Sequence, residues 1–92
     1  MIRAFKSRAL KKFFETGNAS RLSVPNIARV ERLLTSLNSA ASPQAMNLPG
    51  YGFHALKGNR SGTYAVSASG NWRLTFKWDG QDAIDVDLED YH

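Results

Sequence analysis

The last three residues, Asp90, Tyr91 and His92, place a carboxylate, a phenol and an imidazole side by side, and the sequence has one other histidine, His54. Imidazoles and carboxylates can donate or accept protons near neutral pH. Two imidazoles, with a surplus of Lys and Arg and no cysteine, suit a metal-free attack on a phosphodiester. Chain ends usually fray, so the last three residues could instead be a disordered end. A single histidine in a strand is more often structural, so His54 could instead have a structural role. We predict that these four residues take part in chemistry.

A guanidinium is the next candidate group. Arg73 lies in the middle of the clearest predicted strand, where it could grip a phosphate through two parallel hydrogen bonds and stabilise transition-state charge. The alternative is a cross-strand ion pair, worth at most about 1 kcal/mol when exposed. The acids available for that pair are Asp85, Asp87 and Glu89. The two roles are compatible, and the sequence leaves both open.

Three further cations are candidate phosphate ligands. Lys57 and Arg60 lie in a turn that contains Gly58 and Gly62, and Lys77 shares the predicted outward strand face with Arg73. Exposed N–H groups and cations suit a phosphate backbone, although most basic turns are only solvated. The turn matches no nucleotide-binding signature. The histidines and acids lack metal-ligand spacing, so we expect neither a metal nor another cofactor.

The net charge of +4 conceals an uneven distribution. Residues 1–77 contain all twelve Lys and Arg against two Glu, a net charge of +10. Residues 78–92 contain six acids and no Lys or Arg, a net charge of −6. A cationic surface attracts polyanions such as nucleic acid, with an affinity that falls steeply as salt rises. A basic composition that serves only solubility is the alternative.

The length of 92 residues and the 42% hydrophobic content predict one globular domain over residues 1–92. The absence of cysteine excludes disulfides and thiolate chemistry. No apolar run has the length of a signal-peptide core or of a membrane span. We therefore expect a soluble, cytoplasmic protein with no membrane partner.

Hydrophobic spacing predicts two helices near the N-terminus. Apolar residues recur at helical spacing from Phe5 to Phe14, with lysines and arginines between them, and Gly17-Asn18 provides a stop. A second helix begins near Pro25, which suits a first helical position, and ends at Asn38-Ser39. A short polar link joins the two helices, so we expect a helical hairpin, followed by a loop over 42–52.

From Tyr51 onward the period changes to that of strands. We predict strands over 51–57, 63–67, 72–78 and 84–88. In the third, Trp72, Leu74, Phe76 and Trp78 share one face and Arg73, Thr75 and Lys77 share the other. Asp79-Gly80 is a strong hairpin signal, and Ile84, Val86 and Leu88 alternate with acids beyond it. Helices followed by an antiparallel meander predict an α+β domain in which both helices cover the apolar sheet face.

Four segments carry a resemblance to a known family. They are 1–6 (MIRAFK), 54–60 (HALKGNR), 71–76 (NWRLTF) and 89–92 (EDYH). Their order and spacing resemble the HigB toxins of bacterial type II toxin–antitoxin systems, also called plasmid maintenance killer proteins. The resemblance covers the whole length. HigB toxins belong to the RelE superfamily, so it implies two N-terminal helices on a curved antiparallel sheet, the RelE-like microbial ribonuclease fold.

The resemblance also implies functional residues. The family's active-site histidine corresponds to His54, its strand arginine to Arg73, and its terminal acid, tyrosine and histidine to Asp90, Tyr91 and His92; Lys57 is a weaker correspondence. Ala55 stands where proline is common in relatives, and Asn59 stands where aspartate is expected. Neither position carries a proton-transfer group, so neither change weakens the implied chemistry.

The implied activity is ribosome-dependent cleavage of messenger RNA by attack of a ribose 2′-OH on the adjacent phosphate. We assign His92 as base, Asp90 as the group that orients it, His54 as acid and Tyr91 as a stacking or phosphate contact, with exchange of the acid and base roles left open. The implied partners are the ribosome, messenger RNA and a helix-turn-helix antitoxin of the HigA type. A non-catalytic RNA-binding module and a gyrase-poisoning toxin of the same superfamily are the alternatives.

Overall fold

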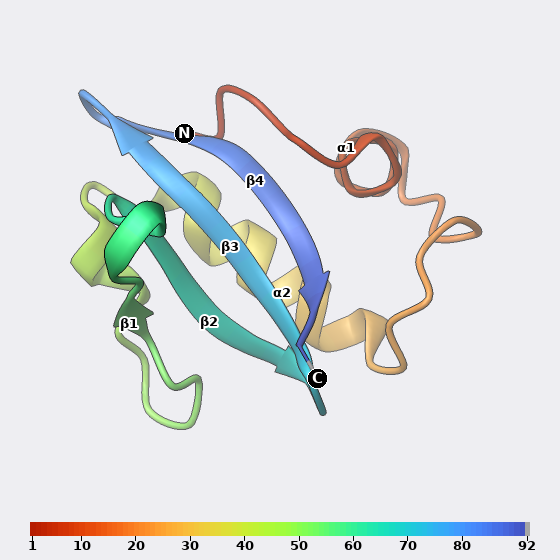
Figure 1. The fold of residues 1–92 in the computed structure, drawn as a ribbon. Coiled ribbons are helices and arrows are strands. Elements are labelled where there is room, and N and C mark those ends of the chain that lie inside the picture. The colour runs from red at the N-terminus through yellow and green to blue at the C-terminus, as the bar shows by residue number, and fades with distance from the viewer. Residues whose placement is uncertain (92) are drawn as a thin grey trace.

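The computed structural model describes residues 1–91 and contains an antiparallel sheet with helices on one side (Figure 1). In chain order the elements are α1 (Arg8–Thr16), α2 (Ile27–Ser39), the 3₁₀ turn η1 (Pro43–Met46), β1 (His54–Ala55), the 3₁₀ turn η2 (Gly58–Arg60), β2 (Thr63–Ser69), β3 (Trp72–Asp79) and β4 (Asp82–Asp90). The four strands follow the order β1-β2-β3-β4. The predicted α+β fold is therefore confirmed.

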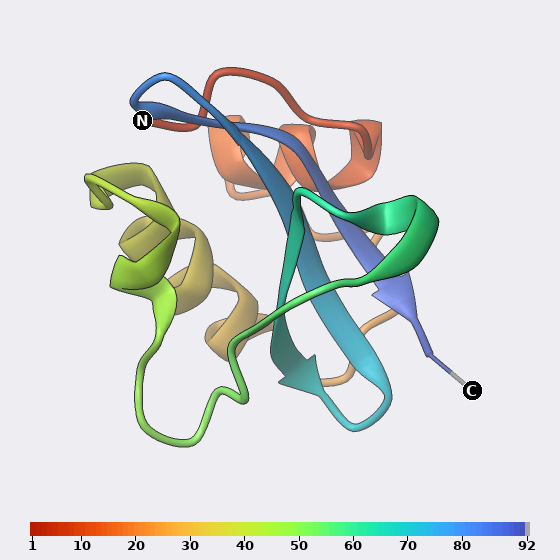
Figure 2. The same ribbon diagram turned by 60° about the vertical axis from the view of Figure 1, so that its left-hand side comes forward.

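The two broad sides of the sheet differ. α2 lies behind the sheet and η2 lies in front of it in Figure 1, and the turned view of Figure 2 shows them on opposite sides of the strands. Fully buried side chains of α2 and of the central strands form the core between them, and they include Val30, Leu34, Val66, Leu74 and Phe76. Burial of this apolar surface is the main stabilisation of the fold. The face that carries η2 is left open to solvent, and we call it the open face.

The first helix is shorter than predicted and begins at Arg8. The Ser7 hydroxyl accepts a hydrogen bond from the Leu10 N–H at 3.1 Å and so caps the helix. Phe5, which was predicted to begin the helical spacing, instead forms a parallel bridge with Val86 of β4, and Ile2 forms one with Ala83. The predicted stop is confirmed, because Gly17 adopts φ 78° as a left-handed C-cap.

The second helix begins two residues later than predicted. Asn26 is its N-cap, and the Asn26 side chain accepts from the Arg29 N–H at 3.1 Å. The expected helical hairpin is wrong, since α1 is seen end-on while α2 runs lengthwise behind the sheet (Figure 1). Only α2 covers the sheet broadly. α1 lies beside the β4 edge and adds Leu10 and Phe13 to the core.

The first strand is much shorter than the predicted 51–57. Only His54 and Ala55 pair with β2, opposite Ala65 and Tyr64. The preceding residues do not continue the strand because Gly50 and Gly52 adopt φ 83° and 60°, which extended strands do not use.

The last strand differs from a simple alternation. Asp85 has φ 50°, and the register between β3 and β4 shifts between Thr75 and Lys77. This is a β-bulge, which puts one extra residue into β4. Ala83 and Val86 are consequently both fully buried, although the predicted inward set was Ile84, Val86 and Leu88.

Candidate active site on the open face of the sheet

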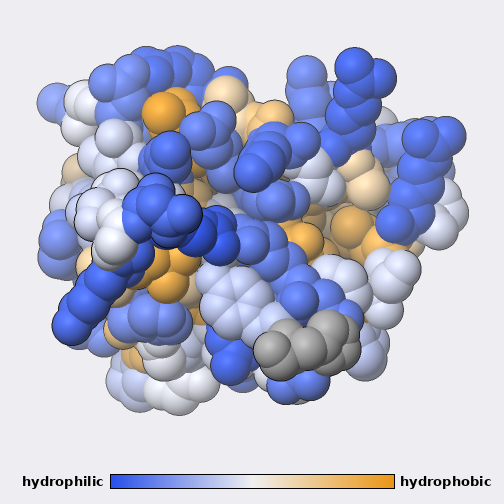
Figure 3. All heavy atoms as spheres, in the orientation of Figure 1, coloured by the Kyte–Doolittle hydropathy of each residue, from blue (hydrophilic) through white to orange (hydrophobic). Residues whose placement is uncertain are grey.

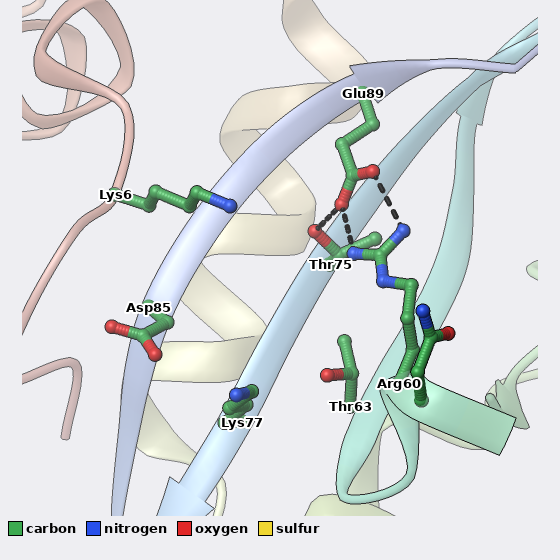
Figure 4. Close-up of a pocket in the computed structure, with 8 residues that line it drawn as sticks. Lys6, Arg60, Thr63, Thr75, Lys77, Asp85 and Glu89 are labelled. Atoms are coloured by element: carbon green, nitrogen blue, oxygen red, sulfur yellow. Dashed lines mark hydrogen bonds and ion pairs between the residues drawn. The ribbon is translucent and has the colours of Figure 1, made fainter. Parts of the chain in front are cut away.

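A hollow of about 330 Å³ opens on the open face (Figure 4). Its walls come from the N-terminal segment, η2 and strands β2 to β4, and its lining residues are Lys6, Asn59, Arg60, Thr63, Thr75, Lys77, Asp85 and Glu89. Three cations thus face two carboxylates. Hydrophilic residues cover most of this side of the molecule (Figure 3). The hollow suits a polar, anionic ligand better than an apolar one.

A three-residue cluster occupies the centre of the hollow. Arg60 donates two hydrogen bonds to Glu89, from Nη1 to Oε1 at 2.9 Å and from Nη2 to Oε2 at 2.6 Å. The hydroxyl of Thr75 donates to the same Oε2 at 2.5 Å. The bond from Arg60 lowers the pKa of Glu89, with a smaller contribution from Thr75, and the bond to Glu89 raises the pKa of Arg60. Figure 4 shows the two side chains meeting over β3.

Arg73 and Tyr91 do not line the hollow, but Arg73 is the strand neighbour of Glu89, which does. Arg73 pairs with Glu89 across β3 and β4, but the Glu89 carboxylate binds Arg60. The Nη1 of Arg73 instead donates to the backbone carbonyls of Gly70, at 2.9 Å, and Trp72, at 3.1 Å. Its guanidinium carbon lies 5.8 Å from the centre of the Tyr91 ring. Within residues 1–91, Arg73 forms no salt bridge with the acids proposed for it.

His54 lies on the same side of the sheet. It is directly opposite Ala65, and Ala65 is directly opposite Thr75 of the central cluster, so one row of side chains joins them. The His54 Nδ1 lies 2.9 Å from the carbonyl oxygen of Gly52, and the ring is exposed. The sheet therefore presents an imidazole and the cationic hollow to the same solvent.

The remaining predicted residues are less closely grouped. Lys57 is exposed immediately before η2, and Lys77 lines the hollow. Asp90 pairs with Trp72, whose side chain packs against the core, so strand alternation directs Asp90 away from the face that carries Arg73. His92 lies outside the described residues. The structure thus brings Arg60 and Lys77 together and places Arg73 with Tyr91.

Sequence reasoning did not predict six of the residues that line the hollow, which are Lys6, Asn59, Thr63, Thr75, Asp85 and Glu89. Lys6 was counted with the cationic face of the first helix, but its N–H donates to the Val86 carbonyl at 2.9 Å and fixes it beside β4. The sequence could have predicted Glu89 as a site residue, because the predicted hairpin places it near Arg73 on the outward face. Its contact with Arg60, 29 residues away, has no local signal.

No group of three or more His, Asp or Glu within residues 1–91 lies close enough together to hold a metal ion. No helix in the described part of the chain is long and apolar enough to cross a membrane.

The fold and the site together define a class of protein. Two helices and a four-stranded antiparallel sheet form an α+β arrangement consistent with the RelE-like toxin fold. The model of one family, described as "RelE-like toxin of type II toxin-antitoxin system HigB", matches residues 3–92. The chain belongs to this family of HigB-like toxins, which implies an antitoxin as partner. It is also 35% identical, over the full length of both proteins, to Endoribonuclease HigB of Proteus vulgaris.

Proposed function

We propose that this chain is an endoribonuclease toxin that cleaves messenger RNA on the ribosome and blocks translation until an antitoxin neutralises it. The observation that carries the proposal is the full-length similarity to Endoribonuclease HigB of Proteus vulgaris. The position of His54 on the same sheet face as the hollow supports this proposal. RNA bound on that face would contact the cations of the hollow and also the imidazole of His54.

The proposed reaction is a transesterification that requires no metal. A base takes the proton of a ribose 2′-OH, the 2′-oxygen attacks the adjacent phosphorus, and the bond from phosphorus to the 5′-oxygen breaks. An acid then protonates the 5′-oxygen, which leaves a 2′,3′-cyclic phosphate, or a 3′-phosphate after hydrolysis, and a 5′-OH. We assign His92 as base and His54 as acid, and the reverse assignment obeys the same balance.

The charge that develops on the phosphorane needs cations. We assign this role to Arg73, with Lys57 as a second cation, because a preorganised guanidinium stabilises such charge strongly. Tyr91, beside Arg73, would stack on a base or contact a phosphate. Lys77 in the hollow would bind the flanking backbone, and Arg60 would do so by exchanging Glu89 for a phosphate. Asp90 as the residue that orients His92 stays a prediction.

The ribosome would supply part of the catalysis. A positioned acid or base contributes about 10²- to 10⁴-fold, so an open site on a small sheet gains much from a substrate held in a reactive geometry. We expect strong cleavage on translating ribosomes and weak cleavage of free RNA. The antitoxin would be a helix-turn-helix protein of the HigA type, and the site of action would be the cytoplasm.

Mapping of messenger-RNA 5′ ends in a translating extract tests the proposal. The wild-type chain should create new 5′-OH ends within translated codons, and His54→Ala, Arg73→Ala and His92→Gln should reduce them strongly. A chain that binds RNA but creates no new ends would be a non-catalytic RNA-binding module. New double-strand breaks in DNA without RNA ends would indicate the gyrase-poisoning alternative.

A further inference from the structure

Arg29 reaches from α2 to the loop that precedes His54, and it was not among the predicted site residues. Its Nη2 donates to the Gly50 carbonyl at 3.0 Å, and its Nε donates to the Ser67 carbonyl of β2 at 3.2 Å. Its guanidinium carbon also lies 4.1 Å from the centre of the Tyr51 ring. The side chain of Asn26, the N-cap of α2, accepts a hydrogen bond from the N–H of Arg29, and this bond fixes the backbone of Arg29 at the start of α2.

The loop that Arg29 holds has little structure of its own. Gly50 and Gly52 both adopt left-handed φ, which leaves Tyr51 on a backbone with no regular pairing. Tyr51 is held to β2 by its carbonyl, which accepts from the Ser67 N–H at 2.7 Å. Arg29 binds the carbonyls on both sides of that contact, at Gly50 and Ser67. One half-buried guanidinium therefore joins the loop to the sheet.

The far end of the loop contacts the imidazole. The Gly52 carbonyl lies 2.9 Å from Nδ1 of His54, and a carbonyl oxygen can only accept a hydrogen bond. Nδ1 must therefore carry the hydrogen, and Nε2 is left as the atom that can exchange a proton with a ligand. Phe53 lies between Gly52 and His54 in the sequence. Its ring stacks on Tyr64 of β2, with ring centres 5.7 Å apart, and so holds this part of the backbone against the sheet.

We propose that Arg29 is a positioning residue that holds the Gly50–Gly52 loop so that the Gly52 carbonyl fixes the Nδ1–H tautomer of His54 and Nε2 faces RNA. The catalytic part of this inference rests on the proposed function. The usual role of an arginine in a cationic protein is a solvated charge or a nucleic-acid contact. Arg29 differs because two backbone carbonyls and an aromatic ring already occupy its guanidinium.

Single-turnover cleavage on programmed ribosomes tests the catalytic part, because it separates the maximal rate from the toxin concentration at half-saturation. Arg29→Met should lower the maximal rate about tenfold or more, within the range that an acid-base group supplies, and leave half-saturation nearly unchanged. Arg32→Met removes the same charge from an exposed position three residues along α2 and should leave both quantities unchanged. A loss confined to half-saturation would mean that Arg29 only binds RNA, which overturns the inference.

A double variant shows whether Arg29 acts through His54. His54→Ala with Arg29→Met should cleave no more slowly than His54→Ala alone, since residues that act as a unit are not additive. A further tenfold loss in the double variant would overturn the inference. Arg29→Lys keeps the charge but cannot bind two carbonyls in the same fork, so it should restore folding without restoring the rate. If Arg29→Met folds poorly, Arg29→Lys replaces it in the cleavage measurement.

Imidazole ¹⁵N spectra test the tautomer without any cleavage. The chain has two histidines, so His92→Gln assigns the His54 signals. Neutral His54 should show the Nδ1–H pattern in the wild type and in Arg32→Met, and a mixture with the Nε2–H form in Arg29→Met. An unchanged tautomer in Arg29→Met contradicts the inference. A wild type that shows the Nδ1–H pattern but cleaves nothing contradicts the proposed function and leaves the structural role of Arg29 intact.

Discussion

Arg60 and Arg73 reach the same open face of the sheet, but the two guanidinium groups are engaged differently. Arg60 is neutralised by the two oxygens of Glu89, whereas Arg73 donates to the neutral carbonyls of Gly70 and Trp72. Strand register alone would pair Glu89 with Arg73, because the two are directly opposite. The η2 turn delivers Arg60 into that position instead. The pairing of one arginine thus leaves the charge of the other uncompensated by a carboxylate within residues 1–91.

This difference separates two roles. A charge that is held by neutral dipoles stays available to an incoming phosphate, and the site does not have to break an ion pair to use it. Arg60 can bind phosphate only by exchanging Glu89 for it. We therefore expect Arg73 to act mainly on the reaction, and Arg60 with Glu89 to act mainly on the shape and stability of the hollow.

The largest effect should come from Arg73→Ala. Loss of a preorganised charge at the reacting phosphate costs about 10²- to 10³-fold in rate, so cleavage on ribosomes should fall by that amount. The free energy of unfolding should change by less than about 1 kcal/mol, since both acceptors lost are neutral backbone carbonyls next in sequence or three residues away, and one of the two bonds is exposed. Cleavage assays paired with urea unfolding measure both. An Arg60→Ala variant that loses as much rate without losing stability would reverse the assignment of the two arginines.

Glu89→Gln sharpens the comparison from the other side. The amide keeps the size of the side chain but removes the charge that Arg60 and Thr75 bind, so we expect a loss of about 1–2 kcal/mol in the free energy of unfolding. Arg60 is released in this variant and its charge becomes available to RNA. Affinity for ribosomes should therefore hold or rise while stability falls. Asp87→Asn, on the same strand and face, is the control, and an equal loss there would mean that overall charge is responsible.

The Arg60 and Glu89 pair also predicts a pH dependence. The pKa of Glu89 is lowered in the folded protein, mainly by Arg60, so its ionised form is stabilised by folding. This contribution is complete above the ordinary glutamate pKa of 4.5 and is lost as the pH falls through the lower folded value. The advantage of the wild type over Glu89→Gln should therefore shrink as the pH falls below 4.5. Urea unfolding at a series of pH values measures this, and a constant difference down to pH 2 would contradict it.

The sequence predicted the parts of this molecule that depend on neighbouring residues. Alternation and the Asp79-Gly80 signal predicted β3, β4 and their turn, and Gly17 predicted the end of α1. The sequence-based prediction failed where contact with a distant segment of the chain determines the local structure. The pairing of Ile2 and Phe5 with β4 takes them out of helical spacing, and the bulge at Asp85 changes which residues of β4 face the core.

The same division holds for the candidate site. His54, Arg73 and Tyr91 were predicted from residue type and family resemblance, and the structure places Arg73 beside Tyr91. The central cluster was not found, because Arg60, Thr75 and Glu89 come from three elements that meet only in the folded sheet. Arg29 was missed for the same reason. Its partners are backbone carbonyls, and a sequence shows no feature that marks which carbonyl an arginine will reach.

The smallest effect should come from Thr75→Val, which removes one hydroxyl at the base of the hollow. Thr75 is buried, and valine has nearly the same shape, so the loss should be confined to the hydrogen bond to Glu89. We expect about 0.5–1.5 kcal/mol in the free energy of unfolding and less than about threefold in cleavage rate. In a Glu89→Gln background the cost of Thr75→Val should shrink, because the charged acceptor is gone. A cost that is equal in both backgrounds would show that Thr75 stabilises β3 independently. Among the side-chain hydrogen bonds of residues 1–91, those from Arg60 would then be the ones that hold Glu89 in place, and the separation between the stabilising and the reactive arginine would depend on that ion pair.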